Sequence, residues 1–368
     1  MEKGSRNPRI CMIVQQPDVK GGIAAVTNGY YDSRLEKEYK LCYIESYCDG
    51  SKIKKAVKAL KSYIQFYKCL RGFKPELVHV HSSFGPSFYR MQPFLYMAKK
   101  KNIPVIDHCH GADFNTFYVN ASDKKKKRIR KVYNDFDKVI VLSDEWKKKM
   151  GEVLPDDKMV VIENYCKPKN EELIEKLFSE RFERKQVLFL GELGKRKGGF
   201  DFAGIIDNAH KGDIDIKFAL CGSGTDSEVN EIKEAVYKVT SKEKALFPGW
   251  VRGNEKDNIL RESAVFMLPS YDEGLPMSIL DAMAYGLPVV STNVGGIPQL
   301  VENGKNGFLC EPGDTKALGE RIKELLSDRD RYISASRESY RIAGQNYSFD
   351  AHLEKLFKVY DLVLGYEG

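Results

Sequence analysis

The sequence predicts an α/β protein built from two doubly wound parallel sheets, and three observations support this. The chain has 368 residues, more than one hydrophobic core usually accommodates. Short runs that are apolar throughout alternate with longer helical patterns, which is typical of parallel strands covered by helices on both faces. The runs form two consecutive series, so we expect two sheets of the same type.

The first expected series contains strands at residues 9–14, 77–81, 105–108, 138–142 and 159–162. The second contains strands at residues 187–191, 216–221, 245–247, 265–268, 289–291 and 307–310. A charged helical segment within residues 167–184 separates them, so we place one domain over residues 1–170 and another over residues 180–345. Apolar residues at helical spacing predict a C-terminal helix within residues 348–368, which we expect to pack on the first domain.

Composition describes an ordinary soluble protein, with 42% hydrophobic and 30% charged residues. No apolar run approaches the ~18 residues of a membrane span, and the first residues lack the apolar segment of a signal peptide. The eight cysteines contain no C-x-x-C pair. We therefore expect buried thiols in a reducing cytoplasm, with no metal-like grouping and no disulfide framework.

Charge is distributed unevenly along the chain. Residues 1–170 hold 33 Lys and Arg against 19 Asp and Glu, a net +14, and the other 26 against 33 give −7, which sums to +7. Basic runs occupy residues 51–74 and 124–131. Apolar residues near one helical face of the first run are Ile53, Val57, Leu60, Ile64 and Tyr67. This helix faces either the core or an anionic membrane, and the basic excess of the whole half favours the membrane. We expect no nucleic-acid partner, because the basic runs lack interleaved aromatic residues.

Ligands of open parallel sheets bind beyond the carboxyl ends of the strands, so we expect a site in a cleft lined by loops of both domains. Gly21 and Gly22 follow the first strand and open a helix, where backbone N–H groups can approach a phosphate. A Gly-Gly turn is also a common tight connection. His110 follows another strand and could meet a ligand hydroxyl, although a lone histidine is more often structural.

Zinc is conceivable from the histidines of this half, which are His79, His81, His108 and His110. No carboxylate or cysteine lies at helical ligand spacing from them, so we expect no metal site.

Loops of the second half could bind a diphosphate or a base. Arg196 and Lys197 lie in a glycine-rich turn after a strand, where Arg offers a forked contact and Lys a point charge. The turn lacks the G-K-[ST] ending of an ATPase loop, and basic turn residues are often only solvated. Gly222 ends the next strand, and Val251 and Arg252 follow the one after it.

Residues 272–290 contain two acids that helix architecture alone does not explain. Pro276 suits the first turn of a helix over residues 277–285, and Gly286 suits its C-terminal cap. Glu273 just before the helix could favour its dipole, but Asp281 in the interior is a poor helix former. The pair therefore indicates a chemical role.

At these residues the chain resembles glycosyltransferase family 4, retaining enzymes of the GT-B fold. The family's hallmark is an acid, seven residues and a second acid, which Glu273 and Asp281 match. The resemblance continues, in the expected order, over the Gly21-Gly22 loop, Val-His-Val-His at 78–81, His110-Gly111, Lys197-Gly198, Gly295-Gly296-Ile297-Pro298 and Asn306-Gly307-Phe308-Leu309.

The resemblance implies a role for each matching residue. Glu273 would accept hydrogen bonds from the donor sugar, Asp281 would bind the ribose, and His110 would lie near the sugar. Lys197 and Gly22 would hold the diphosphate. The segment that would offer its backbone to the sugar and diphosphate consists of Gly274, Leu275, Pro276, Met277 and Ser278. No metal or other cofactor would be needed, because cations and helix N-termini neutralise the leaving diphosphate.

Three positions depart from the family pattern. Asp281 is one methylene shorter than the usual Glu, and Gln299 stands where a Glu often follows Gly-Gly-Ile-Pro. Glu192 stands where the family usually has Arg, and we expect Arg196 to supply the missing cation.

The resemblance implies a cytoplasmic enzyme, peripheral at the inner face of the cell membrane. It would transfer a sugar, with retention, from a nucleotide-sugar, most simply a UDP-sugar, to a saccharide acceptor that is lipid-linked, in cell-surface polysaccharide biosynthesis. Two alternatives stay open, a nucleotide-sugar epimerase of related fold and a non-catalytic protein that binds sugar nucleotides or polyanions.

Overall fold

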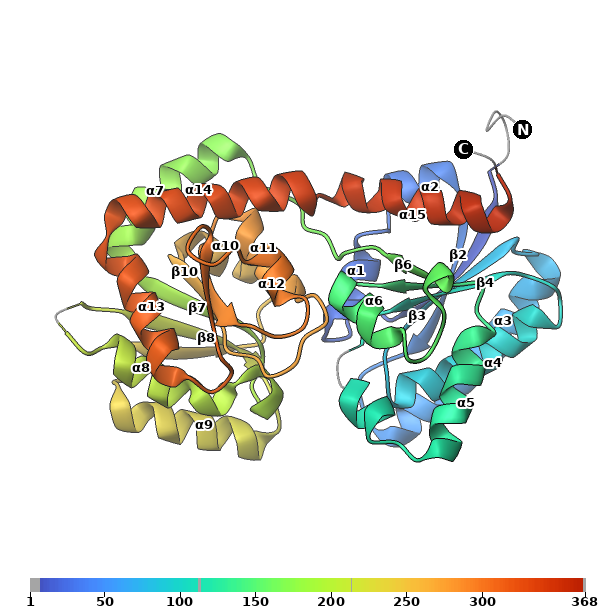
Figure 1. Ribbon diagram of the computed structural model, residues 1–368, viewed down its shortest axis with the longest axis horizontal. Helices are drawn as coiled ribbons and strands as arrows, with labels where there is room; N and C mark the ends of the chain where they lie inside the picture. The colour runs from blue at the N-terminus through green and yellow to red at the C-terminus, as the bar shows by residue number, and fades with distance from the viewer. Residues whose placement is uncertain (1–6, 112–113, 213, 367–368) are drawn as a thin grey trace. The chain divides into compact units, whose positions relative to one another are not determined.

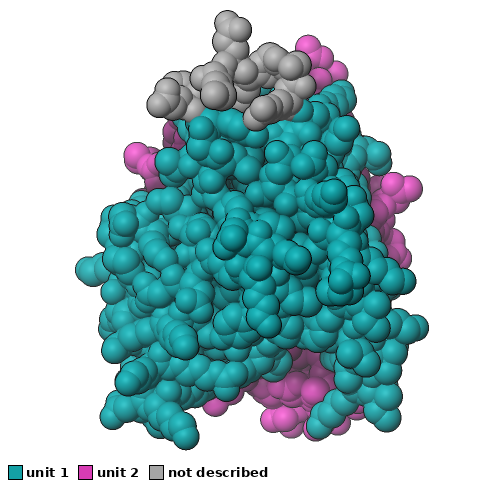
Figure 2. All heavy atoms as spheres, turned by 90° about the vertical axis from the view of Figure 1, so that its right-hand side faces the viewer, with its two compact units in different colours: residues 1–164, 350–368 teal, residues 165–349 magenta. Residues whose placement is uncertain are grey.

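The computed structural model describes residues 7–111, 114–212 and 214–366. The first six residues of the predicted first domain and the last two of the predicted C-terminal helical segment therefore lie outside the described residues. The chain forms two compact units, residues 1–164 with 350–368 (unit 1) and residues 165–349 (unit 2), which Figure 2 colours separately. The division falls earlier than the sequence suggests. Cys166 donates its backbone N–H to the Tyr347 carbonyl, so the chain already pairs with unit 2 at this point.

Unit 1 contains a six-stranded parallel sheet of order β2-β1-β3-β4-β5-β6 (Figure 1). Its strands are β1 (Arg9–Gln15), β2 (Lys40–Tyr47), β3 (Leu77–Ser82), β4 (Val105–Cys109), β5 (Lys138–Val141) and β6 (Met159–Val161). The sequence prediction lacked β2. This strand lies at the edge of the sheet, and most of its residues are only half-buried, so it does not form the continuous apolar run of a central strand.

The helices of unit 1 are α1 (Gly22–Asn28), α2 (Arg34–Glu38), α3 (Lys52–Gly72), α4 (Pro86–Lys99), η1 (Asn115–Val119), α5 (Asp123–Asn134), α6 (Asp144–Met150), η2 (Asp156–Lys158) and α15 (Phe349–Leu364). Because side chains alternate along a strand, β3 serves two cores. Val78 and Val80 join Phe66 of α3 and Phe94 of α4, whereas His79 meets Tyr360 of α15. In the described ranges, no helix combines the length and apolarity that crossing a bilayer requires.

Unit 2 contains a second six-stranded parallel sheet, of order β12-β11-β10-β7-β8-β9. Its strands are β7 (Gln186–Glu192), β8 (Lys217–Ser223), β9 (Ala245–Gly249), β10 (Val265–Leu268), β11 (Val289–Thr292) and β12 (Gly307–Cys310). Each corresponds to an expected strand of the second series. The prediction of two doubly wound parallel sheets is confirmed.

The helices of unit 2 are α7 (Glu171–Arg184), η3 (Lys195–Lys197), η4 (Gly199–Asp201), α8 (Phe202–Ala209), α9 (Asp226–Val239), α10 (Gly253–Glu262), α11 (Met277–Ala284), α12 (Ile297–Leu300), α13 (Thr315–Ser327) and α14 (Arg329–Asn346). They cover both faces of the sheet, with α8 beside α9 and α13 in one layer and α7 beside α10 and α14 in the other (Figure 1).

Each sheet reverses its strand order once. In unit 1 the chain runs from β1 outward to β2 and then returns to place β3 on the other side of β1. In unit 2 it runs from β7 to β8 and β9 and then places β10 on the other side of β7. Loops that leave the two neighbouring strands in opposite directions open a crevice, and this is where such sheets bind ligands.

Candidate functional site

The loops after β7 and β10 meet at the reversal point of the unit 2 sheet. Tyr271 donates its backbone N–H to the Arg196 carbonyl over 2.8 Å. Gly198 has a φ of +70°, and a Cβ there would lie 2.0 Å from the Pro269 carbonyl oxygen. Only glycine meets both conditions, so this glycine lets the basic turn lie directly against the loop that carries Glu273.

Glu273 is the centre of this contact. Its carboxylate is nearly buried, accepts a hydrogen bond from Ser270 Oγ over 2.7 Å and forms an ion pair with Lys197 Nζ. Arg196 Nη1 lies 4.0 Å from Glu273 Oε1, the oxygen that Ser270 and Lys197 also contact. A carboxylate removed from water needs such partners, because desolvating an unpaired charge costs on the order of several kcal/mol and the attraction of a nearby cation offsets that cost. Three residues predicted for the site are therefore brought together.

The backbone of Glu273 rests on a second pair of glycines. A Cβ on Gly295, whose φ is +55°, would lie 1.9 Å from the Glu273 carbonyl oxygen. The next residue, Gly296, donates its N–H to the Gly274 carbonyl over 2.7 Å. Thr292 at the end of β11 donates its hydroxyl to the Ser270 carbonyl over 2.5 Å. The end of β11 and the glycines that follow it thus support the loop that carries Glu273, a role that the sequence did not assign.

Arg196 has two further acceptors. It donates to the Asp272 carbonyl over 3.2 Å and pairs with Glu192 over 3.4 Å. Glu192, which stands where the family usually has a cation, therefore partly neutralises the cation expected to replace it.

Helix α11 begins at Met277, as predicted, and ends one residue earlier than predicted. Pro276 has an extended backbone conformation and is the N-cap, so the expectation that it occupies the first helical turn is wrong. The Pro276 carbonyl accepts the N–H groups of Ile279 and Leu280. An N-cap residue can accept these first hydrogen bonds of the helix without having helical backbone angles itself. The helix ends at Ala284, and Gly286 follows in the left-handed conformation with a φ of +69°, as expected for a C-terminal cap.

Asp281 lies in α11 and forms an ion pair with Lys256 of α10, with Lys256 Nζ 2.5 Å from Asp281 Oδ2. Both side chains are partly exposed. The sequence analysis did not identify Lys256, because α10 carries charges of both signs and no motif. The pair links α10, which begins just after Arg252, to the helix that begins at the acidic loop.

A buried arginine also holds these helices. Arg181 of α7 donates to the Arg261 and Leu260 carbonyls near the end of α10 and to the Tyr285 carbonyl after α11. The sequence assigned it to a charged helix between the domains. Burial lowers the pKa of Arg181 to about 10, and it caps carbonyls that helix ends leave unpaired.

The remaining predicted residues of unit 2 have different surroundings. Gly222 faces Gly191 of β7 so closely that a Cβ would lie 1.9 Å from the Gly191 carbonyl oxygen, which gives this glycine a packing role. Val251 is half-buried and Arg252 is exposed as the N-cap of α10. Both follow β9, at the sheet edge.

In unit 1, Gly21 and Gly22 lie at the start of α1, at the reversal point next to β1. Gly21 is the N-cap with a φ of +140°, and a Cβ there would meet no atom within 4 Å. Both glycines are exposed. The loop is open, unlike the glycine contacts of unit 2.

His110 follows β4 and lies among four other histidines, which are His79 and His81 of β3, His108 of β4 and His352 of α15. Its Nε2 hydrogen-bonds His81 Nδ1 over 3.0 Å, and its ring stacks on His108 with centroids 4.2 Å apart. His79 Nδ1 hydrogen-bonds Tyr360 of α15 over 2.7 Å. His352 of α15 hydrogen-bonds Tyr30 over 2.8 Å.

These imidazoles are held in the neutral form. Burial lowers the pKa of His79 and His110 to about 3 and that of His352 to about 4, and lowers the pKa of His81 and His108 further. Buried ring nitrogens without a hydrogen-bond partner among the described residues are His79 Nε2, His81 Nε2, both nitrogens of His108 and His110 Nδ1.

The structure corrects one expectation about metal ligands. The sequence predicts no metal site, because the cysteines are scattered singly and no carboxylate or cysteine lies at helical ligand spacing from the histidines. Two groups nevertheless form within unit 1, Cys11 with Cys42 and Cys69, and His79 with His81 and His108, each with ligand atoms within 4.8 Å of one another. Seven of the eight thiols are buried, as predicted, and Cys42 is half-buried.

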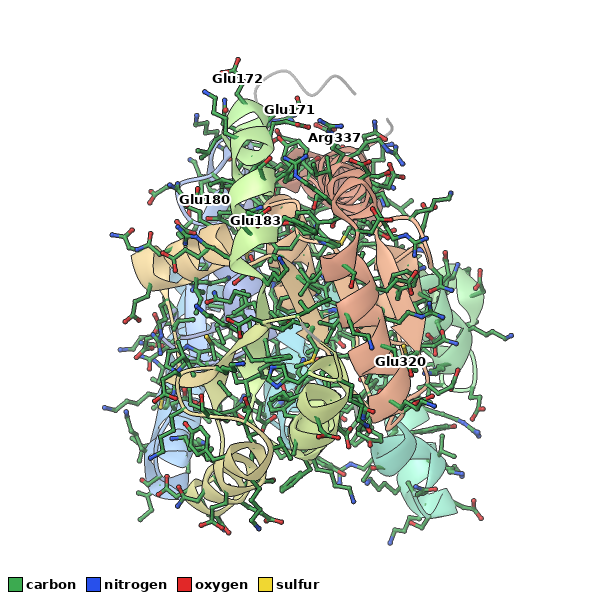
Figure 3. All side chains as sticks on the ribbon, turned by 90° about the vertical axis from the view of Figure 1, so that its left-hand side faces the viewer. Glu171, Glu172, Glu180, Glu183, Glu320 and Arg337 are labelled. Carbon is green, nitrogen blue, oxygen red and sulfur yellow. The ribbon has the colours of Figure 1, made fainter. Side chains whose placement is uncertain are left out.

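A groove of about 1110 Å³ in unit 2 contains none of the predicted site residues. It lies between α7 and α14 and is lined by charged side chains, including Glu171 and Arg337, which Figure 3 labels. Arg337 is paired with Glu175 through two contacts of 2.8 and 2.9 Å. Arg341 of the same groove is likewise paired with Glu338, and we assign the groove no role.

Comparisons with known proteins agree with this geometry. The sequence profile of glycosyl transferases group 1 matches residues 170–346, and that of Glycosyltransferase Family 4 matches residues 26–167. The UDP-Gal:alpha-D-GlcNAc-diphosphoundecaprenol alpha-1,3-galactosyltransferase of Escherichia coli is 26% identical over 316 residues, covering 80% of this chain and 77% of the relative.

Solved structures show the same fold. Sucrose-phosphate synthase from Thermosynechococcus elongatus superposes with a TM-score of 0.82 at 15% identity, covering 98% of this chain and 100% of the other. Anabaena HepE in complex with UDP and glucose gives a TM-score of 0.73 at 17% identity, covering 96% and 100%.

The architecture is therefore that of the GT-B glycosyltransferases. The chain belongs to the group 1 glycosyltransferases, family 4, and is a glycosyltransferase.

Proposed function

We propose that the protein transfers a sugar, with retention of anomeric configuration, from a UDP-sugar to a saccharide acceptor carried on a lipid diphosphate, in cell-surface polysaccharide biosynthesis. The observation that carries this proposal is the convergence of Lys197, Arg196 and Glu273 at the reversal point of the unit 2 sheet. The names of a diphosphoundecaprenol-dependent relative and of a UDP complex support the classes of acceptor and donor.

The two cations would stabilise the leaving nucleotide diphosphate. As the bond between the anomeric carbon and the diphosphate oxygen breaks, negative charge grows on the diphosphate, and Lys197 and Arg196 would neutralise it. The first N–H groups of α11, at Met277 and Ser278, have no acceptor within their own helix and point toward the same loop. The acceptor hydroxyl would attack the same face of the sugar, and its proton would pass to the departing diphosphate.

The acids would bind the neutral parts of the donor. Glu273 would accept hydrogen bonds from sugar hydroxyls, and its ion pair with Lys197 would orient it. Asp281 would accept from the ribose hydroxyls with its second oxygen, while Lys256 holds the first. Gly222, Val251 and Arg252 would contact the nucleotide, and in unit 1 His110 would approach the sugar while Gly21 and Gly22 approach the diphosphate.

The reaction would need no metal, because protein cations take that role. Transfer should continue at the same rate in excess EDTA, and a requirement for a divalent ion would reject this part of the proposal. The product anomer, determined by NMR, should have the configuration of the donor, and inversion would reject the retaining mechanism.

Donor choice is tested by thermal shift with UDP-, GDP- and ADP-sugars, since a ligand of the native state raises stability in proportion to its affinity. A UDP-sugar should give the largest rise in Tm. The same rise in Asp281→Asn would show that this acid does not bind the nucleotide.

The alternatives have their own signatures. An epimerase would convert the donor to its epimer without an acceptor, whereas a glycosyltransferase would not. A non-catalytic binding protein would give the thermal shift without transfer or donor hydrolysis, and Glu273→Ala would then change binding only.

We propose further that α3 lies on an anionic membrane surface. The five apolar residues that could have faced the core are exposed, by 77% for Ile53, 61% for Leu60 and 52% for Ile64, and by 47% for both Val57 and Tyr67. The core face is narrow instead, with Ser62, Phe66 and Cys69. The helix contains seven Lys and Arg and no acid. An exposed apolar stripe flanked by cations matches a surface of anionic headgroups and acyl chains.

The α5 helix is a weaker candidate for the same surface. Its basic side chains cover aromatic rings of unit 1, with Lys125 over Phe117 and Arg128 over Tyr89. Arg130 donates to the Tyr118 hydroxyl over 2.7 Å. These cations have internal partners, so α3 is the helix to test.

Sedimentation with phosphatidylglycerol vesicles tests the membrane proposal. The wild type should bind at low salt and be released by high salt, because screening weakens contacts with exposed charges. Ile53→Ser with Leu60→Ser should reduce binding more than tenfold, since each apolar side chain contributes about 1.5–3 kcal/mol when buried.

Leu246→Ser with Leu362→Ser is the matched control. These two leucines are exposed by 48% and 60% but lie outside α3, so binding should not change. Equal binding by both double variants would reject α3 as the membrane surface.

A further inference from the structure

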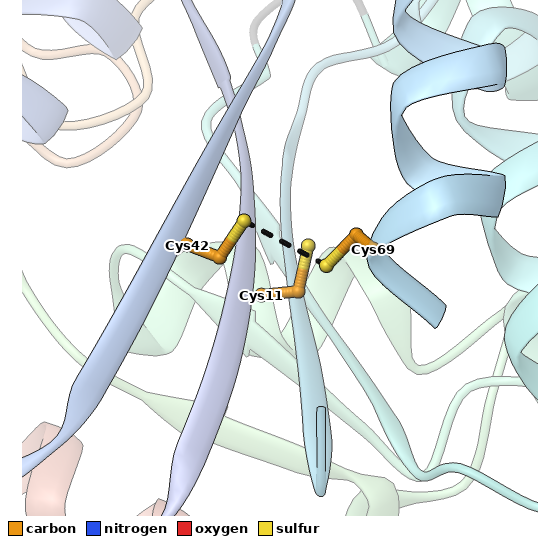
Figure 4. A group of neighbouring side chains, drawn as sticks. All are labelled: Cys11, Cys42 and Cys69. Carbon is orange, nitrogen blue, oxygen red and sulfur yellow. Dashed lines mark hydrogen bonds between the residues drawn. The ribbon is translucent and has the colours of Figure 1, made fainter. Parts of the chain in front are cut away.

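Three thiols of unit 1 gather beneath α3, away from the residues assigned to sugar transfer. Cys11 and Cys42 are paired neighbours on the adjacent strands β1 and β2, and Cys69 of α3 lies over them (Figure 4). Cys69 Sγ lies 3.6 Å from Cys42 Sγ, and all three sulfurs lie within 4.8 Å of one another.

We propose that Cys11, Cys42 and Cys69 form a three-thiolate site for one soft metal ion of the Zn²⁺ type. Sulfur ligands about 2.3 Å from a tetrahedral ion lie about 3.8 Å from each other. The Cys69 and Cys42 sulfurs, 3.6 Å apart, are close to this value, and the Cys11 sulfur lies within 4.8 Å of both, so side-chain adjustments of about an ångström or less would bring the three sulfurs onto one ion. Thiolates select soft ions over Mg²⁺ or Ca²⁺, which prefer oxygen.

The surroundings provide an entry path and a reason for pH dependence. Cys11 and Cys69 are buried, whereas Cys42 on the edge strand is half-buried, so an ion and a fourth ligand such as water can approach from its side. Thiols bind such an ion as thiolates, so the ion must displace their protons, and affinity should rise with pH.

Such an ion would fasten α3 to the edge of the sheet. Ser62, Phe66 and Cys69 are the buried residues of this 21-residue helix, and Tyr63 and Leu70 pack partly buried against the same core, so a bond from Cys69 through the ion to two strands would supplement this packing. The site therefore has a structural role and is independent of sugar transfer.

Titration of the reduced, full-length protein with Co²⁺ under argon tests the proposal. A thiolate-to-cobalt charge-transfer band should appear and saturate at one Co²⁺ per chain, and Zn²⁺ should abolish it by displacement. The His79, His81 and His108 group could bind Co²⁺ as well, but imidazole ligands give no thiolate band.

Cys42→Ser should lose the band, whereas Cys48→Ser, a buried cysteine of the same unit outside the group, should keep it. Circular dichroism would verify that both variants fold. Alkylation of Cys42 by iodoacetamide should also slow at least tenfold in the presence of Zn²⁺. No charge-transfer band in the wild type, or an equal band in Cys42→Ser, would overturn the proposal and leave three thiols that pack as small apolar side chains.

Discussion

The carboxyl edges of the two sheets are built differently, although both sheets have six parallel strands and one reversal of strand order. In unit 2 the edge is held by glycine-to-carbonyl contacts and by the ion pair of Lys197 with Glu273. In unit 1 it carries an open glycine turn at Gly21 and a cluster of neutral histidines.

This difference separates two ways of preparing a site. The charged groups of unit 2 are already paired, so a diphosphate would exchange one set of partners for another with little rearrangement. The imidazoles of unit 1 are neutral and several of their nitrogens lack partners among the described residues, so protonation disturbs them. Four experiments test this difference between the two edges.

Acid should weaken unit 1 more than unit 2. Five of the six histidines of the chain lie in unit 1. The folded pKa values of about 3 for His79 and about 4 for His352 lie below the ordinary value of about 6.5. Between these values the unfolded chain binds more protons, so stability present above about pH 6.5 is lost as pH falls, by up to about 1.4 kcal/mol per pH unit for each imidazole.

Asp107 acts in the opposite direction. Burial raises its pKa to about 7, so its contribution to stability falls as pH rises, and this single carboxyl only partly offsets the histidines. The Tm of unit 1 should fall by more than about 10 °C from pH 7 to pH 5. Trp146 reports unit 1 in Trp250→Phe, and Trp250 reports unit 2 in Trp146→Phe. Equal losses in the two units would contradict the difference that we draw.

Lys197→Ala should lower kcat/KM for sugar transfer by about 100- to 1000-fold, because a contact with the developing diphosphate charge is lost. Lys195→Ala is the matched control, since Lys195 lies in the same turn but is exposed. Its kcat/KM should stay within about twofold of the wild type, as expected for a solvated charge. Equal effects of the two substitutions would show that the turn acts only through its general positive charge.

Gly198→Ala should destabilise unit 2 by about 3 kcal/mol, through left-handed strain and contact with the Pro269 carbonyl. Gly21→Ala in unit 1 has strain without a contact, and should cost about 1 to 2 kcal/mol. Urea unfolding followed through the two tryptophan reporters measures both. A larger loss for Gly21→Ala would mean that the open turn of unit 1 is the more constrained of the two.

Glu192→Ala should have the smallest effect, a decrease in donor KM of up to about fivefold, because an exposed ion pair is worth about 0–1 kcal/mol. Removal of this carboxylate would leave Arg196 without one competitor for the diphosphate. The effect should vanish when Arg196→Ala is also present. An improvement that survives in the double variant would assign it to general electrostatics rather than to Arg196.

Much of unit 2 was predictable from the sequence. Its central strand β10 is buried and apolar throughout, and its site residues come soon after strand ends, as Lys197 does after β7 and Glu273 after β10. Edge strand β2 was missed, because a half-exposed strand has no continuous apolar run. Lys256 and Arg181 were missed as well, because a charged residue on a helix shows no sign in the sequence of what it will contact.

The two sheets, the loops that carry the chemistry and the residue types within them follow from the amino-acid sequence alone, because periodicity and glycine placement are local properties. The packing of the folded chain set the exposure of the apolar stripe of α3 and the pairing of Glu273 with Lys197. It also decided that Cys11, Cys42 and Cys69 lie together. These outcomes depend on which face of an element another element covers, and strand order and packing set that between residues far apart in the chain.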